Sequence, residues 1–156
     1  ELPSYPNLII TQTLSKAYGL AGIRLGFCMA SEEIINILNK IKPPYNINSL
    51  TQEYAISALE DWDATLEQII QLIAERKFLF AQLEKISFVE KVYPSDANFL
   101  LVRVDDANKR YTQLIQNDIV VRNRSNQVGC ENCLRFSVGT PQENQILIET
   151  LNCLSS

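Results

Sequence analysis

The 156-residue sequence has no histidine, one methionine, one tryptophan and only five glycines. Without histidine, a structural zinc site would need the cysteines alone, and Cys28 and Cys153 do not make a second close pair beside Cys130 and Cys133. The Cys130-x-x-Cys133 spacing also precedes an expected strand, whereas a thioredoxin-like pair follows one. We therefore interpret all four as free thiols and expect no metal site.

Positive charge and long apolar runs are also scarce. The formal net charge of −4 argues against nucleic-acid and anionic-membrane partners. No apolar run approaches the roughly 20 residues that span a bilayer, and no signal peptide is recognised, so we expect a cytoplasmic protein. Hydrophobic residues at 46% and charged residues at 21% are typical of a globular chain with a core, in one domain or two small ones.

The few glycines match neither G-x-G-x-x-G nor G-x-x-x-x-G-K-[ST], which excludes those two routes to phosphate binding. Three of them nevertheless lie in residues 11–26, together with hydroxyls, Lys16 and Arg24, directly after the apolar run Leu8–Ile10, an expected buried strand. A lysine amine can condense with an aldehyde, and a guanidinium suits a phosphate. The combination suggests pyridoxal phosphate, although an isolated Ser-Lys pair is also typical of a solvated loop.

A resemblance favours the cofactor interpretation. Thr13-Leu14-Ser15-Lys16-Ala17, followed by Gly19-Leu20-Ala21-Gly22-Ile23-Arg24-Leu25-Gly26, resembles the lysine segment of fold-type-I aminotransferases and is most similar to that of the histidinol-phosphate aminotransferases. The resemblance implies that Lys16 carries pyridoxal 5'-phosphate as the catalytic residue. It also implies that Thr13, Ser15 and Arg24 bind the cofactor, with Ser15 and Arg24 on its phosphate.

Three further residues gain a role from the same resemblance. Leu134-Arg135-Phe136-Ser137-Val138-Gly139-Thr140 is similar to the R-x-[ST]-x-G-T segment of the family, whose arginine holds the substrate α-carboxylate. Val121-Arg122 matches an arginine near the substrate phosphate, and Tyr45, after Pro44, matches a substrate contact. From the residues alone, Arg122 and Arg135 are equally typical of surface cations and Tyr45 of a packing residue.

The coarse pattern predicts an α/β fold. We expect a second buried strand at 27–30, then a helix that Pro43-Pro44 ends and whose buried face carries Ile34, Ile35, Ile37, Leu38 and Ile41. Ser49-x-x-Gln52 predicts a capping box, and a long helix at about 62–86 carries an apolar stripe (Leu66, Ile69, Ile70, Ile73, Phe80 and Leu83).

Beyond that helix the pattern indicates an edge strand at 88–93, a central strand at 99–104, a helix near 107–115 and strands at 119–122 and 133–138. A capping box from Thr140 to Glu143 predicts the last helix. The resemblance implies that residues 1–75 end the large cofactor-binding domain and that 76–156 form the small C-terminal domain of a fold-type-I transferase.

The expected activity is transamination between histidinol phosphate and 2-oxoglutarate in histidine biosynthesis. The partners would be a phosphorylated amino substrate and a 2-oxo acid, and the full protein would be a homodimer. Because the only methionine is Met29 and the lysine segment comes so early, we expect a C-terminal fragment that is inactive alone. The alternatives are a threonine-phosphate decarboxylase-like enzyme and a non-catalytic module that binds a phosphorylated ligand.

Overall fold

The computed structural model describes residues 2–155, which fall into two compact units that divide between Glu67 and Gln68. Their boundary lies inside helix α3 (Trp62–Leu83), the long helix that the sequence predicts. The division predicted at residues 75 and 76 falls in the same helix and stays a prediction. Among the described helices, none is both long and apolar enough to cross a membrane.

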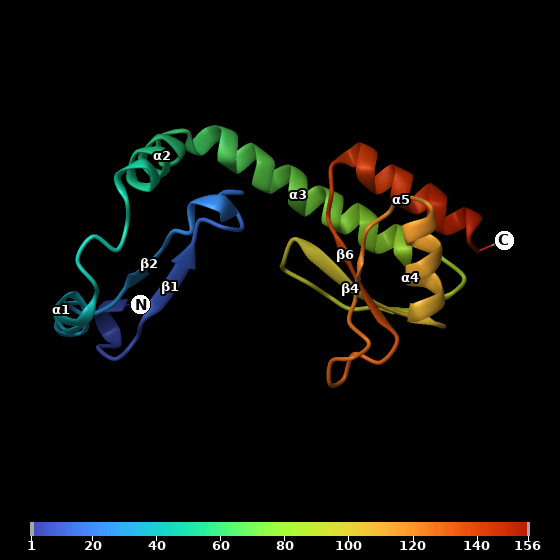
Figure 1. The fold of residues 1–156 in the computed structure, drawn as a ribbon, viewed down its shortest axis with the longest axis horizontal. Coiled ribbons are helices and arrows are strands. Elements are labelled where there is room, and N and C mark those ends of the chain that lie inside the picture. Colours follow the sequence, from blue (N-terminus) through green and yellow to red (C-terminus); the bar gives the residue numbers. More distant parts are fainter. Residues whose placement is uncertain (1, 156) are drawn as a thin grey trace. The chain divides into compact units, whose positions relative to one another are not determined.

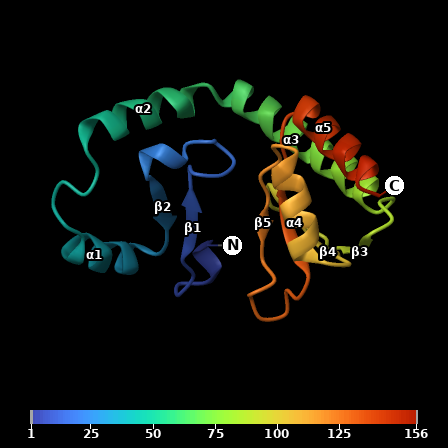
Figure 2. The same cartoon turned by 45° about the vertical axis from the view of Figure 1, so that its right-hand side comes forward.

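The first unit is built on a two-stranded antiparallel ribbon (Figure 2). The register pairs Ile10 with Met29 at one end and Thr13 with Gly26 at the other. Two short 3₁₀ turns and two helices accompany the ribbon. The elements are η1 (Leu2–Ser4), β1 (Ile10–Thr13), η2 (Ala21–Ile23), β2 (Gly26–Met29), α1 (Glu32–Ile41) and α2 (Ser49–Glu60).

The burial predicted for this unit is wrong. The strand expected at Leu8–Ile10 starts at Ile10, and the side chains of Ile10, Phe27 and Met29 are exposed. Two strands alone bury little apolar surface, because a ribbon needs a further layer to cover its face. Helix α1 ends before Pro43-Pro44 as expected, yet none of its residues is buried, and Ile41 is 71% exposed.

The cap of α2 also differs from the prediction. Asn48, not Ser49, is the N-cap, and its side-chain oxygen accepts a hydrogen bond from the Thr51 amide at 2.9 Å. Gln52 donates its side-chain amide to the carbonyl of Ile47 at 2.9 Å instead of closing a capping box. Asparagine and serine are equally good N-caps, so sequence alone could not decide between adjacent candidates.

The second unit is a four-stranded antiparallel sheet with helices packed on one face (Figure 1). The strand order is β3-β4-β6-β5, so the predicted edge and central strands are confirmed. In both views α5 lies alongside the C-terminal part of α3. The elements are β3 (Val89–Val92), β4 (Phe99–Val104), α4 (Ala107–Gln116), β5 (Arg122–Asn123), β6 (Cys133–Ser137) and α5 (Pro141–Cys153).

The core of this unit follows the alternation of β4 and β6. Every second residue is buried against the helices, while on the opposite face the β4 residues and Arg135 are half-buried, Cys133 is buried and Ser137 is exposed. Of the apolar stripe predicted on α3 only Leu83 is buried, whereas Leu66, Ile70 and Ile73 are exposed; the other buried residue of the helix, Leu79, lies outside that stripe. The sheet side of the core comprises Val92, Leu100, Val102, Val104, Leu134 and Phe136.

The predicted capping box of α5 is present. The Thr140 hydroxyl accepts from the Glu143 amide at 3.3 Å, and the Glu143 carboxylate accepts from the Thr140 amide at 2.7 Å. The Thr140 hydroxyl also donates to that carboxylate, at 2.9 Å, and the two hydrogen bonds that the carboxylate accepts, from the amide and the hydroxyl of Thr140, lower the pKa of Glu143. The helix therefore starts directly after β6, which fixes the end of the strand that carries Arg135.

Candidate active site

The predicted lysine segment is the connection between β1 and β2. The two ends of this connection, which we call its neck, are joined by a hydrogen bond from the Leu14 amide to the Leu25 carbonyl at 3.1 Å, and Leu14 is buried. Gly19, at φ +66°, donates its amide to the Lys16 carbonyl at 2.9 Å, so a tight turn begins at Lys16. The amine of Lys16 is exposed, and no group among residues 2–155 bonds to it.

The two hydroxyls before Lys16 have different local roles. Thr13 Oγ1 donates to the Leu25 carbonyl at 3.4 Å and accepts from the Ser15 amide at 3.1 Å. Thr13 thereby shapes the turn that presents Ser15 and Lys16. The Ser15 hydroxyl has no partner in the described chain, so it is available to a ligand.

Arg24 lies at the C-terminal end of the same connection, between η2 and β2. Its backbone is left-handed, with φ +55°, and its Nη1 donates to the Ala21 carbonyl at 3.0 Å. Residues 11–26 contain no aspartate or glutamate, so no acid of this segment neutralises Lys16 or Arg24. A free amine, a free hydroxyl and a guanidinium therefore share one short connection.

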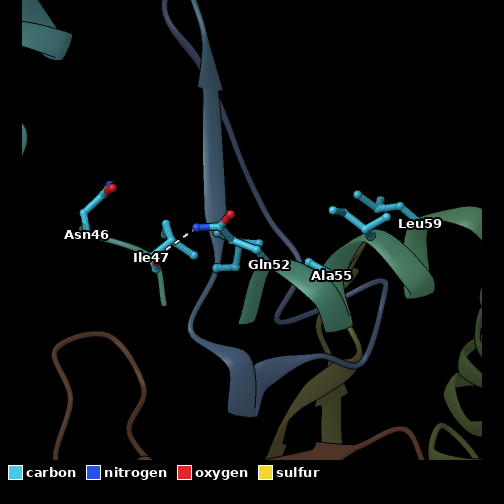
Figure 3. Close-up of a pocket in the computed structure, with 7 residues that line it drawn as sticks. Asn46, Ile47, Gln52, Ala55 and Leu59 are labelled. Carbon is cyan, nitrogen blue, oxygen red and sulfur yellow. Dashed lines mark hydrogen bonds between the residues drawn. The ribbon is translucent and has the colours of Figure 1, made fainter. Parts of the chain in front are cut away.

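Tyr45 lies on the loop between α1 and α2. It is 97% exposed and has a left-handed backbone at φ +58°. Beside this loop the first unit has a hollow of about 320 Å³, lined by Leu25, Asn46, Ile47, Gln52, Ala55, Ile56 and Leu59. Figure 3 shows Gln52 reaching back to the Ile47 carbonyl at this hollow, with Ala55 and Leu59 further along α2.

The hollow connects two predicted site segments, because Leu25 follows Arg24 and Asn46 follows Tyr45. No sequence pattern predicts this hollow, since its lining comes from separated segments of the chain. The remaining predicted residues, Arg122 and Arg135, belong to the second unit, and their relation to the lysine connection stays a prediction.

Within the second unit the structure brings Arg122 and Arg135 together. They are direct partners in the β5–β6 register. The Arg135 guanidinium lies 4.9 Å from the Phe99 ring centre, and its Nε is buried without a partner among the described residues. Burial lowers the pKa of Arg135, and the charges of Arg124 and Arg122 lower it further.

Arg124 is a site candidate that sequence reasoning missed. The resemblance assigns it no role, yet its amide donates to the Cys133 carbonyl at 2.8 Å, which extends the β5–β6 ladder by one residue. The available signal was its position two residues after Arg122, because side chains at i and i+2 of a strand share a face.

Comparison with known proteins places these features in a family. The family model described as aminotransferase class I and II matches residues 1–151. The histidinol-phosphate aminotransferase of Flavobacterium johnsoniae is 59% identical over 155 residues, which are 99% of this chain and 44% of that protein.

Two solved structures are also similar. The histidinol-phosphate aminotransferase from Clostridium acetobutylicum has a TM-score of 0.90 and 29% identity, over 99% of this chain and 48% of that one. The enzyme from Sinorhizobium meliloti, solved in complex with pyridoxal-5'-phosphate, has a TM-score of 0.81 and 25% identity, over 96% of this chain and 41% of that one. The chain thus spans less than half the length of these relatives. Because the family model covers nearly all of its residues, the chain belongs to the aminotransferase class I and II family.

Proposed function

We propose that this chain is the C-terminal part of a pyridoxal-phosphate-dependent aminotransferase that acts on histidinol phosphate, with 2-oxoglutarate as the amino acceptor, in histidine biosynthesis. The observation that carries the proposal is the β1–β2 connection, where Lys16, Ser15 and Arg24 offer an amine, a hydroxyl and a guanidinium without any acid. The names of the similar proteins support the choice of substrate.

The residues present fit the cofactor. The Lys16 amine would hold its aldehyde carbon, and the Arg24 guanidinium and Ser15 hydroxyl would bind its phosphate ester. Thr13 would keep the turn in shape through its hydrogen bonds to Leu25 and Ser15. When bound, pyridoxal phosphate supplies the electron sink for bonds broken at the substrate Cα. Lys16, once released, would move the proton from that Cα as general base.

The second unit would bind the substrate. Arg135 would hold the α-carboxylate of the 2-oxo acid, because a planar guanidinium makes two parallel hydrogen bonds to a carboxylate and histidinol phosphate itself carries none. Arg122, its cross-strand neighbour, would bind the substrate phosphate. Tyr45, fully exposed on its loop, would contact the substrate as well.

We also propose that the whole protein is a cytoplasmic homodimer. The apolar side chains of β1 and β2, including Ile10, Phe27 and Met29, are exposed in this chain. This exposure supports the inference that a further layer covers them in the complete protein. On the same grounds, the 156-residue chain alone should not catalyse transamination.

The decisive experiment traps the bound aldehyde. The complete enzyme is incubated with pyridoxal phosphate and reduced with borohydride, and the modified lysine is mapped by mass spectrometry. We expect one adduct, on Lys16, and its loss in Lys16→Ala together with all turnover of histidinol phosphate. Lys40→Ala, which changes another exposed lysine, should retain the adduct on Lys16 and the turnover of histidinol phosphate.

Two outcomes would contradict the proposal. An adduct on a different lysine, or turnover retained in Lys16→Ala, would remove the catalytic assignment. Release of carbon dioxide from threonine phosphate, without amino transfer from histidinol phosphate, would favour the decarboxylase alternative.

A further inference from the structure

The exposed face of the second sheet carries four arginines around one strand. The register places Leu101, Arg135 and Arg122 in one cross-strand row. Two residues further along each strand, and therefore on the same face, Arg103 is paired with Cys133, and the ladder hydrogen bond from the Arg124 amide places Arg124 beside Cys133. Directly opposite side chains lie about 5 Å apart and diagonal ones about 7–8 Å, so Arg124 is a diagonal neighbour of Arg135.

Arg103 already has neighbours that use its charge. The Cys133 thiol and, to a lesser degree, Tyr93 raise the pKa of Arg103, and its guanidinium lies 6.0 Å from the Tyr93 ring centre. Its Nε is buried and makes no hydrogen bond with the described residues. Because its charge already interacts with Cys133 and Tyr93, Arg103 is a poor candidate for an additional ligand contact.

Arg122 and Arg124 have no such neighbour among the described residues, and Arg135 has only the Phe99 ring, 4.9 Å from its guanidinium. In the described part of the chain, no carboxylate lies within ion-pair distance of any of the three, and none of their guanidinium nitrogens makes a hydrogen bond. The charges that perturb Arg135 are both positive, those of Arg124 and Arg122. Three cations held together without an acid repel each other, and an anion bound between them would relieve the repulsion.

We propose that Arg124 is a third guanidinium of the substrate-anion site and that, with Arg122, it selects a phosphate monoester over a carboxylate. This inference rests on the proposed function for the identity of the substrate. A phosphate dianion has three terminal oxygens and up to two charges, so it can use two guanidinium groups, whereas the α-carboxylate of the 2-oxo acid is satisfied by Arg135 alone. Ser125, whose buried hydroxyl lacks a partner in the described chain, adjoins Arg124 and offers a further donor.

The test is a titration of the 156-residue chain with inorganic phosphate at low salt. Binding is followed by the NMR signal of the Arg135 Nε–Hε group, so that phosphate bound near Arg24 does not enter the readout. We expect Arg124→Gln to weaken phosphate binding by about tenfold, since one charge-assisted hydrogen bond contributes about that factor. Lys77→Gln, which removes the same charge from an exposed site on α3, should leave the affinity unchanged.

Thermal unfolding shows whether the variants remain folded. Without phosphate, Arg124→Gln should melt no lower than the wild type, because the substitution removes a repulsion. In the complete enzyme, the same substitution should raise the KM for the phosphorylated amino substrate about tenfold while kcat changes little. Acetate affinity of the chain, which reports on carboxylate binding, should be unaffected.

Equal phosphate affinity in Arg124→Gln and wild type would overturn the inference, and so would an equal loss in Lys77→Gln. These results are independent of the borohydride experiment. Phosphate binding that depends on Arg124, without an adduct on Lys16, would refute the proposed function and leave the anion site standing. An adduct on Lys16, together with unchanged phosphate affinity in Arg124→Gln, would support the proposed function and refute the role of Arg124 in the anion site.

Discussion

Arg122 lies directly opposite Arg135 across the β5–β6 ladder, so two like charges occupy neighbouring positions on one face of the sheet. Like charges in this position destabilise a sheet. The pair is therefore poorly explained by folding stability and better explained by an anionic ligand.

The first prediction concerns this pair. Arg122→Gln should stabilise the ligand-free chain by about 0.5 kcal/mol, because it removes the cross-strand repulsion. Urea unfolding of the 156-residue chain measures the change, with Lys77→Gln as a control for net charge. A loss of stability in Arg122→Gln would show that the arginine is held for packing. The same variant should lose phosphate affinity.

The second prediction tests the neck of the lysine connection. A Cβ added to Gly26 would lie 2.8 Å from the Gln12 carbonyl oxygen on the facing strand, so the backbones would have to separate. Gly26→Ala should therefore destabilise the β1–β2 ribbon by roughly 1–3 kcal/mol. Hydrogen exchange of the Leu14 amide, which closes the neck, reports this change directly.

Gly22→Ala is the matched control for that variant. A Cβ at Gly22 meets no atom within 4 Å, so exchange at Leu14 should stay close to the wild-type rate. Similar effects of the two substitutions would mean that close approach of the strands does not limit the ribbon.

The third prediction concerns pH. Arg110 makes a bidentate pair with Asp105, at 2.9 Å from Nε to Oδ1 and 2.7 Å from Nη2 to Oδ2, and this lowers the pKa of Asp105 to about 2. Because the pKa of Asp105 is lower in the folded state than its unfolded value of about 4, the ion pair contributes its full stabilisation above about pH 4. The contribution is lost as the pH falls from about 4 through about 2.

Unfolding by urea at a series of pH values measures this loss. Asp105→Asn should flatten the decline in stability below about pH 4, since the titrating group is gone. Asp96→Asn removes a carboxylate that is fully exposed and 3.6 Å from Arg76, so it should leave the decline close to that of the wild type. An unchanged decline in Asp105→Asn would show that other carboxylates control acid unfolding.

Local sequence signals predicted those parts of the fold in which neighbouring residues decide the structure. The Thr140–Glu143 capping box and the end of α1 before Pro43-Pro44 are both present, because each depends on residues within one helical turn. Burial in the first unit was predicted wrongly. An apolar side chain such as Ile41 carries no information about whether an element exists to cover it.

The candidate site also contains residues that local sequence predicts and features that only the folded structure shows. The spacing from Lys16 to Arg24 and the segment around Arg135 were recognisable, because each is contiguous in sequence. The hollow beside Tyr45 and the diagonal placement of Arg124 depend on which segments become neighbours after folding. The i, i+2 spacing from Arg122 indicates that Arg124 shares its strand face, but no local pattern indicates which strand becomes the neighbour.

Arg24 combines a left-handed backbone with a long charged side chain. An L-residue with a Cβ loses about 1–2 kcal/mol in this conformation, and glycine would avoid most of the loss. Selection for a robust fold alone would therefore replace the arginine. A variant library of this chain that is sorted for thermal resistance should enrich glycine at position 24. The same library sorted for retention of pyridoxal phosphate should enrich arginine there.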